Sequence, residues 1–151
     1  MNCLYRVVSK FSFEEYHRFN YALLNKKHAW FIIIALCVFF LLAGYFLKET
    51  WLIILAIIYP FIFWGVTESH IRKIFKSNKF YQDKEIEYEF YDEYFVEKNE
   101  SGSVKIPYDK LDTIYETKTN FYLMIAKNQG AMISKEKMNE DCMNFIRTIK
   151  K

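Results

Sequence analysis

The sequence predicts an α+β membrane protein, in which a two-helix transmembrane hairpin is joined to a small β domain. Three observations predict this fold class. Two long uncharged stretches lie close together in the first half of the 151-residue chain. The second half alternates apolar and polar residues, as half-buried antiparallel strands do. The final residues return to the helical spacing of apolar side chains.

Composition and charge divide the chain into four parts. We expect an N-terminal strand with an interfacial helix, a hairpin of two spans, a basic juxtamembrane helix, and a β domain ending in a helix. The predicted ranges are 1–28, 29–67, 68–80 and 81–151.

The N-terminal part is more than a leader. Residues 3–11 are rich in β-branched and aromatic side chains and predict a strand. Ser12 and Glu15 have the spacing of a capping box, which starts a helix. Aromatic and basic residues mix along this helix, which predicts that it lies at the membrane interface before the first span.

The two spans are predicted over residues 29–47 and 51–67. A bilayer core needs about 20 apolar helical residues. The alternative is a pair of buried helices in a soluble core, but a chain of this size cannot cover two all-apolar helices. Neither span contains a charged residue, which argues against a transport path. Trp residues lie at or near the span ends as candidate interface anchors: Trp30, Trp51 and Trp64.

Basic residues flank the hairpin on one side. Residues 1–28 carry five basic and two acidic side chains, and a second basic cluster follows the second span. The positive-inside rule therefore predicts that both termini and the β domain are cytoplasmic. The second cluster is also a candidate for weak contact with anionic lipid, although topogenic charge explains most of the signal. Its cations are Arg72, Lys73, Lys76 and Lys79.

The β domain should hold six short strands and a helix that starts near Lys135. The strands are predicted over residues 85–90, 94–98, 103–106, 112–117, 121–127 and 131–134. This order favours a strongly bent sheet or partial barrel, closed by the amphipathic C-terminal helix. About 70 residues form a thin core. We therefore expect either that the N-terminal strand joins the sheet or that the domain forms a homodimer.

Exposed turns of the β domain are the candidate partner-binding loops. Polar residues and glycines cluster between the predicted strands and mark these turns. The candidate residues are Glu100, Ser101, Gly102, Lys118, Asn120, Asn128 and Gln129.

No catalytic, cofactor-binding or metal site is expected. The histidines are scattered, and Cys3, Cys37 and Cys142 lack metal-ligand spacing. A weaker alternative brings His28 and His70 together, with Glu68, on the cytoplasmic side. The β domain is net acidic, with 14 acidic and 11 basic residues, which argues against a nucleic-acid partner.

Several stretches resemble the YcxB-like family of small bacterial membrane proteins. They are YEFYDEYFVEK at 88–98, KIPYDKLDTI at 105–114, ETKTNFYLMIAKNQG at 116–130, FIRTIKK near the C-terminus and FEEYHRFNYAL near the N-terminus. The resemblance implies a location in the bacterial cell membrane and a cytoplasmic domain with a pleckstrin-homology-like fold. It implies no functional residues.

The expected function is that of a non-catalytic binding or scaffolding module, integral to the membrane and recognising a protein partner. Two alternatives stay open. In the first, the chain is an immunity protein that protects the membrane against a toxin or bacteriocin. In the second, it is an accessory subunit of a membrane transporter or enzyme.

Overall fold

The computed structural model describes residues 3–26, 28–78 and 82–149. The chain forms two compact units. The β unit combines residues 1–15 with residues 80–151, and the helical unit consists of residues 16–79. The β unit is therefore interrupted in sequence by the whole helical unit.

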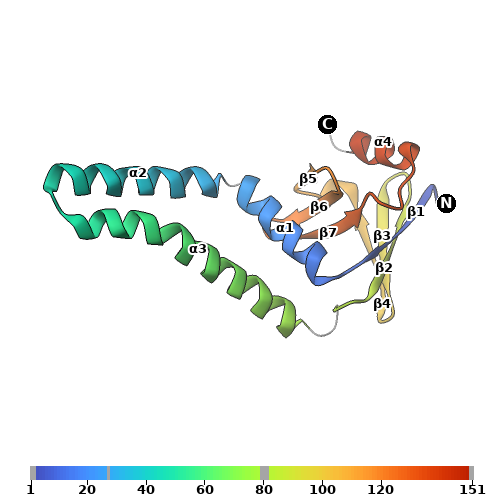
Figure 1. Cartoon of the computed structure of the whole chain (residues 1–151). Coiled ribbons are helices and arrows are strands. Elements are labelled where there is room, and N and C mark those ends of the chain that lie inside the picture. Colours follow the sequence, from blue (N-terminus) through green and yellow to red (C-terminus); the bar gives the residue numbers. More distant parts are fainter. Residues whose placement is uncertain (1–2, 27, 79–81, 150–151) are drawn as a thin grey trace. The chain divides into compact units, whose positions relative to one another are not determined.

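The first sheet of the β unit has four antiparallel strands in the order β1-β2-β3-β4 (Figure 1). Strand β1 pairs with β2 over six residues, from Tyr5 opposite Phe90 to Lys10 opposite Glu85. The expectation that the N-terminal strand joins the sheet is confirmed. The strands are β1 (Tyr5–Lys10), β2 (Glu85–Phe90), β3 (Tyr94–Asn99) and β4 (Gly102–Pro107).

The second sheet has three antiparallel strands in the order β5-β6-β7. The two sheets are separate, so the expectation of one bent sheet or partial barrel is wrong. Pro107 and a short 3-10 helix end β4 before β5 begins, and proline cannot donate to a ladder. The sheets meet where the Ser134 amide donates to Ser9 Oγ at 3.0 Å. The remaining elements are η1 (Tyr108–Lys110), β5 (Thr113–Glu116), β6 (Asn120–Ala126) and β7 (Gln129–Ser134).

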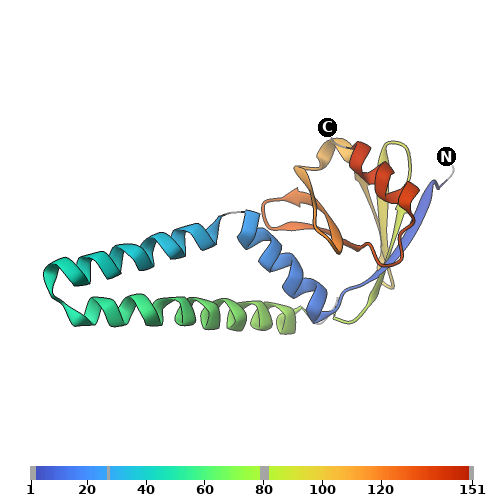
Figure 2. The same cartoon turned by 45° about the horizontal axis from the view of Figure 1, so that its top comes forward.

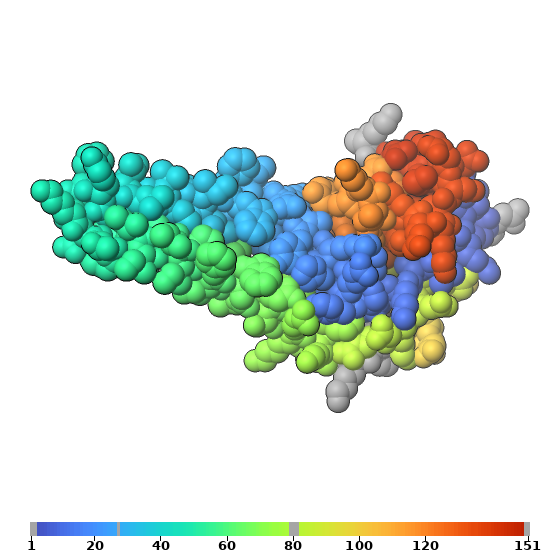
Figure 3. Space-filling view, viewed as in Figure 1, coloured from blue at the N-terminus to red at the C-terminus, as the bar shows by residue number. Residues whose placement is uncertain are grey.

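The core of the β unit lies between these sheets and the C-terminal helix α4 (Glu140–Ile149). Its central side chains are fully buried: Phe90, Phe95, Phe121, Leu123, Ile133 and Ile146. Figure 3 shows the outer side of α4, in red, at the surface.

Helix α4 starts five residues later than predicted. The Cys142 amide donates to Asn139 Oδ1 at 2.9 Å, so Asn139 caps the helix. Lys135 lies before this cap, and its ammonium contacts Glu116 of β5. The expected start at Lys135 is therefore wrong, because residues 135–139 form a turn with its own contacts.

The helical unit contains most of α1 (Phe13–Lys26), together with α2 (Ala29–Leu47) and α3 (Thr50–Ser77). The predicted cap is present, since the Glu15 amide donates to Ser12 Oγ at 3.3 Å. Helix α3 joins the predicted second span and juxtamembrane segment into one helix of 28 residues, with Pro60 inside it.

Helices α2 and α3 run side by side as a hairpin, as Figures 1 and 2 both show. Lys48 adopts a left-handed conformation, and the Glu49 amide donates to the Gly44 carbonyl at 3.0 Å. Both helices are long and apolar enough to cross a membrane. Phe31 is 71% exposed and Phe46 is 75% exposed. Side chains of this kind on both helices favour a lipid environment over the core of a soluble protein.

Candidate functional site

The outer face of the first sheet is the candidate functional site. Ile86, Tyr88 and Phe90 of β2 point into the core, so Glu87 and Glu89 between them lie on the other face. The register places Arg6, Glu89, Val96 and Lys105 in one row across the four strands. The row thus collects one side chain from each strand, from positions far apart in the sequence.

Glu89 is a buried carboxylate at the centre of this face. Its side chain is only 4% exposed, because longer side chains cover it. Arg6 Nη2 donates to Oε1 at 2.7 Å, Lys98 Nζ lies 2.7 Å from Oε2, and the Tyr91 hydroxyl donates to Oε2 at 2.9 Å. Lys98, Tyr91 and Arg6, in that order of importance, lower the pKa of Glu89 to about 2. The carboxylate is therefore charged and holds three donors in place.

A stack of side chains extends from this carboxylate across the sheet. The rings of Tyr91 and Tyr94 are stacked, with centroids 4.7 Å apart. Lys105 Nζ lies 3.5 Å from the centroid of the Tyr94 ring, a cation–π contact. The hydrogen bond to Glu89 raises the pKa of Tyr91 to about 12, so its hydroxyl stays a donor at neutral pH. We call Tyr91, Tyr94 and Lys105 the tyrosine–lysine stack.

The sequence did not single out this site. The alternation in β2 predicts Glu85, Glu87 and Glu89 alike as solvent-facing residues. Only the pairing of β1 with β2 brings Arg6 to Glu89. The abundance of Tyr in residues 88–94 was the one available signal, and it is also typical of a core strand.

The predicted partner-binding loops are exposed with one exception. Glu100, Ser101 and Gly102 form the exposed β3–β4 hairpin, where the Ser101 amide donates to Asn99 Oδ1 at 2.9 Å. The other exposed positions are Lys118, Asn128 and Gln129. Asn120 was expected in an exposed loop as well, and that expectation is wrong. It is fully buried, and its Nδ2 donates to the carboxylate of Glu15.

Glu68, which the sequence places near His28 and His70 in one alternative, contacts His17 and Arg72. Glu68 lies 2.9 Å from His17 Nε2 and accepts from Arg72 Nε at 2.8 Å, all within the helical unit. In the described residues no group of three or more His, Cys, Asp or Glu side chains is placed to hold a metal ion. Burial raises the pKa of the Cys142 thiol to about 11, the opposite of an activated nucleophile.

The predicted membrane-facing residues are exposed on the helical unit. Trp30, Trp51 and Trp64 are 37%, 58% and 57% exposed. Trp30 of α2 and Phe63 of α3 make an edge contact at 6.3 Å, so these span ends lie at the same level. The candidate lipid contacts Arg72, Lys73 and Lys76 are exposed on α3, and Lys79 lies outside the described residues.

Comparison with known proteins gives one match. Residues 90–150 match a family model described as YcxB-like protein. The match begins at the end of β2 and extends through α4, so it covers most of the β unit and none of the helical unit. No curated protein and no solved structure matches the chain. The resemblance found in the sequence is thus confirmed over residues 90–150, which match the YcxB-like protein family.

Proposed function

We propose that the protein is a membrane-anchored, non-catalytic binding module, whose β unit recognises a protein partner in the bacterial cytoplasm. The hairpin of α2 and α3 is the anchor. The tyrosine–lysine stack on the outer face of the first sheet is the recognition surface.

The pairing of β1 with β2 supports an anchor that crosses the membrane twice. Strand β1 precedes both candidate spans and β2 follows them, yet the two strands pair in register over six residues. Paired strands lie about 4.8 Å apart, so they cannot pair from opposite sides of a hydrocarbon core about 30 Å thick. Residues 10 and 85 must therefore lie on the same side. The excess of basic residues next to both spans favours the cytoplasm as that side.

The order of elements supports a pleckstrin-homology-like architecture. Four antiparallel strands, then three antiparallel strands, then one helix follow each other in the β unit. This agrees with the fold that the family resemblance implies. Folds of this type commonly present binding surfaces on a rigid sheet, and their ligands differ from one protein to another.

The tyrosine–lysine stack is the observation that carries the binding function. Tyr and Arg are enriched at protein interfaces, where rigid aromatic side chains give contact area at low entropic cost. Tyr91 is fixed by Glu89, Tyr94 by Tyr91, and Lys105 by Tyr94. A surface fixed in this way loses little conformational entropy when a partner binds. The acidic balance of residues 81–151 favours a protein partner over a lipid headgroup.

Site-specific photocrosslinking in cells tests the binding surface. Ser103 lies on the outer face beside Lys98, whereas Val104 points to the opposite face and is 61% exposed. With p-benzoylphenylalanine in place of Ser103, we expect a discrete crosslinked protein band that Tyr94→Ala removes. The same photolabel in place of Val104 is the matched control. Equal crosslinking at the two positions, or none at Ser103, refutes the proposed surface.

Accessibility labelling tests the anchor. With Cys3→Ser and Ser101→Cys, a membrane-impermeant maleimide should label position 101 only after cell lysis. Labelling of intact cells contradicts the cytoplasmic location and leaves the same-side relation of residues 10 and 85 intact.

A further inference from the structure

One face of α3 lies away from its buried residues in the part of the helical unit that the structure describes. Leu52, Ala56, Ile71 and Phe75 are its buried residues. With about 100° of rotation per residue, the opposite side of the helix carries Trp51, Leu55, Ile58, Ile62 and Gly65. These side chains follow each other at alternating intervals of four and three residues, the spacing of a helix-packing seam. We call this row the outward stripe of α3.

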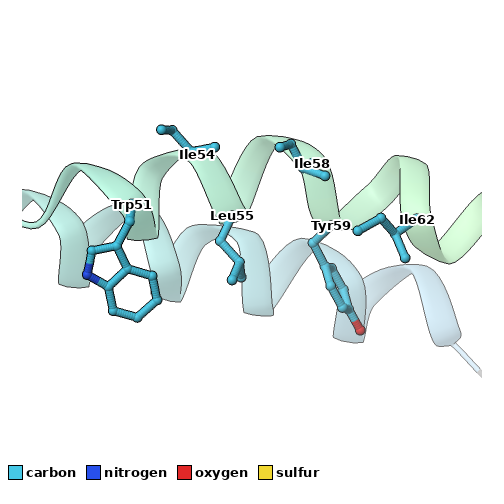
Figure 4. A pocket seen from close by; sticks show the side chains of 6 residues that line it. All are labelled: Trp51, Ile54, Leu55, Ile58, Tyr59 and Ile62. Carbon is cyan, nitrogen blue, oxygen red and sulfur yellow. The ribbon is translucent and has the colours of Figure 1, made fainter.

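The outward stripe contains a groove of about 340 Å³ with an apolar lining. Figure 4 shows its six lining side chains along α3, from Trp51 to Ile62. Gly65 follows on the same stripe, and nothing lies within 4 Å of the position its Cβ would take. A small residue with open space beside it allows another helix to approach closely.

The same stripe continues into basic residues. Ser69, Lys73 and Lys76 lie in line with the apolar part, because five helical turns contain about 18 residues. Lys73 and Lys76 are exposed. Among the described residues, neither lysine has an ion-pair partner. One face of a single helix thus offers an apolar seam followed by two available cations.

We propose that the outward stripe of α3 docks a transmembrane helix of a partner protein that carries acidic residues just beyond its cytoplasmic end. Charge complementarity selects this occupant. A second copy of the chain in the same orientation would place Lys73 and Lys76 beside their counterparts, and like charges at close range repel. Acidic residues at the same level attract them.

The length of the stripe argues for a helix over a lipid. Ile58 and Lys76 are about 27 Å apart along the axis, because each residue adds about 1.5 Å. An acyl chain of the cytoplasmic leaflet reaches through about half of a ~30 Å hydrocarbon core. A lipid with its headgroup at the lysines therefore does not reach the Trp51 end of the groove, whereas a spanning helix covers the whole stripe.

This inference rests on the proposed anchor and is tested in bilayers with the full-length protein. The probe is a synthetic helix of about twenty leucine and alanine residues that ends in three glutamates. A matched peptide ends in three lysines. The protein carries p-benzoylphenylalanine in place of Ile58, and a control protein carries it in place of Ile57, which is exposed but off the stripe. Vesicles of phosphatidylcholine exclude anionic lipid.

We expect the glutamate peptide to crosslink to position 58 about fivefold more than the lysine peptide does, because two exposed charge pairs contribute at the stripe. Position 57 should show little crosslinking with either peptide. The double variant Lys73→Glu, Lys76→Glu should reverse the preference to the lysine peptide, which a misfolded protein would not do.

Three outcomes overturn the inference. The first is equal crosslinking of the two peptides at position 58. The second is predominant crosslinking of the protein to its own copy. The third is a change in crosslinking at position 58 only when phosphatidylglycerol is added to the vesicles. Vesicle flotation separates these outcomes from failure of the proposed anchor. A protein that floats with the vesicles but shows no peptide preference refutes the docking surface alone, and a protein that does not float refutes the anchor.

Discussion

Arg6 donates a 2.7 Å hydrogen bond to Glu89 across 83 residues of sequence. Both candidate spans lie between these two residues. The guanidinium also reaches Glu87, with Nε 2.7 Å from Oε1. An arginine that contacts two carboxylates of the neighbouring strand fixes the register of β1 on β2. The contact therefore ties the residues before the hairpin to the residues after it.

Glu89→Gln should destabilise the β unit by about 1–2 kcal/mol. The amide keeps one acceptor oxygen and loses the charge, and its NH2 group then faces donors that a carboxylate oxygen accepts from in the wild type. Proteolysis in mild detergent measures this loss. The intrinsic Trp fluorescence does not, since all three Trp residues lie in α2 and α3. Glu85→Gln, an exposed position of the same strand, is the control. Similar losses in the two variants contradict the role given to Glu89.

The stability of the β unit should fall as pH drops from about 4.5 to about 2. Glu89 and Glu116 both have a pKa lowered from 4.5 to about 2 in the folded state, Glu116 chiefly by Arg147. Above pH 4.5 both carboxylates are charged whether the chain is folded or not, and their bonds stabilise the folded state. Below it the unfolded chain takes up protons first, so stability is lost.

Pepsin digestion across this pH range measures the effect. The Glu89→Gln variant should lose less stability between pH 4.5 and pH 2 than the wild type, because one of the two titrating groups is absent. If the variant and the wild type lose the same stability between pH 4.5 and pH 2, Glu89 does not contribute to the pH dependence.

Val7→Lys should unfold the β unit, and Val8→Lys should not. Val7 is 3% exposed and lies in the core cluster. A charge placed there without a partner costs several kcal/mol. Val8 points to the outer face opposite Glu87, where a lysine gains a cross-strand partner. Limited proteolysis of the two full-length variants compares them. If the two variants resist the protease equally well, β1 is dispensable for the core.

Gly44→Ala should weaken the α2–α3 hairpin. A Cβ at Gly44 would lie 2.7 Å from Ile53 Cγ1 and 3.2 Å from the Glu49 carbonyl oxygen, so the turn between the helices must open. Gly65→Ala is the matched control, since nothing lies within 4 Å of its Cβ position. Thermal unfolding in detergent, followed by Trp fluorescence, should show a lower midpoint for Gly44→Ala only.

The elements with a strong local pattern could be predicted from the sequence. The uncharged runs define α2 and the apolar part of α3, because few other structures accommodate so many apolar residues in succession. The alternation of Ile86, Tyr88 and Phe90 places β2 and its core face correctly. The turn residues near Gly130 also predict the β6–β7 hairpin correctly, but in the structure the glycine has another role. A Cβ there would lie 2.5 Å from the Leu123 carbonyl oxygen, so close strand packing requires the glycine.

The features that depend on long-range pairing could not be predicted. Glu89 reads as a surface residue until Arg6 and Lys98 are brought beside it. Asn120 reads as a loop residue until Glu15 supplies its partner. Pro107 marks the end of β4 in the sequence, but it does not show that β5 pairs only with β6 and so belongs to a second sheet. The outer-face site depends on such long-range contacts. The sequence shows which residue types are present, but it does not show that the folded chain brings them together.

The interrupted β unit also constrains the order of events during synthesis. Strand β1 leaves the ribosome first, but its pairing partner β2 is made only after both apolar helices. At ordinary elongation rates the strand waits for several seconds with its backbone unpaired. Folding of the β unit is therefore delayed until the hairpin has been synthesised, and an unpaired edge of this kind is a target for wrong pairing. Completion of the first sheet then marks a chain in which the residues before and after the α2–α3 hairpin have both been made and have paired.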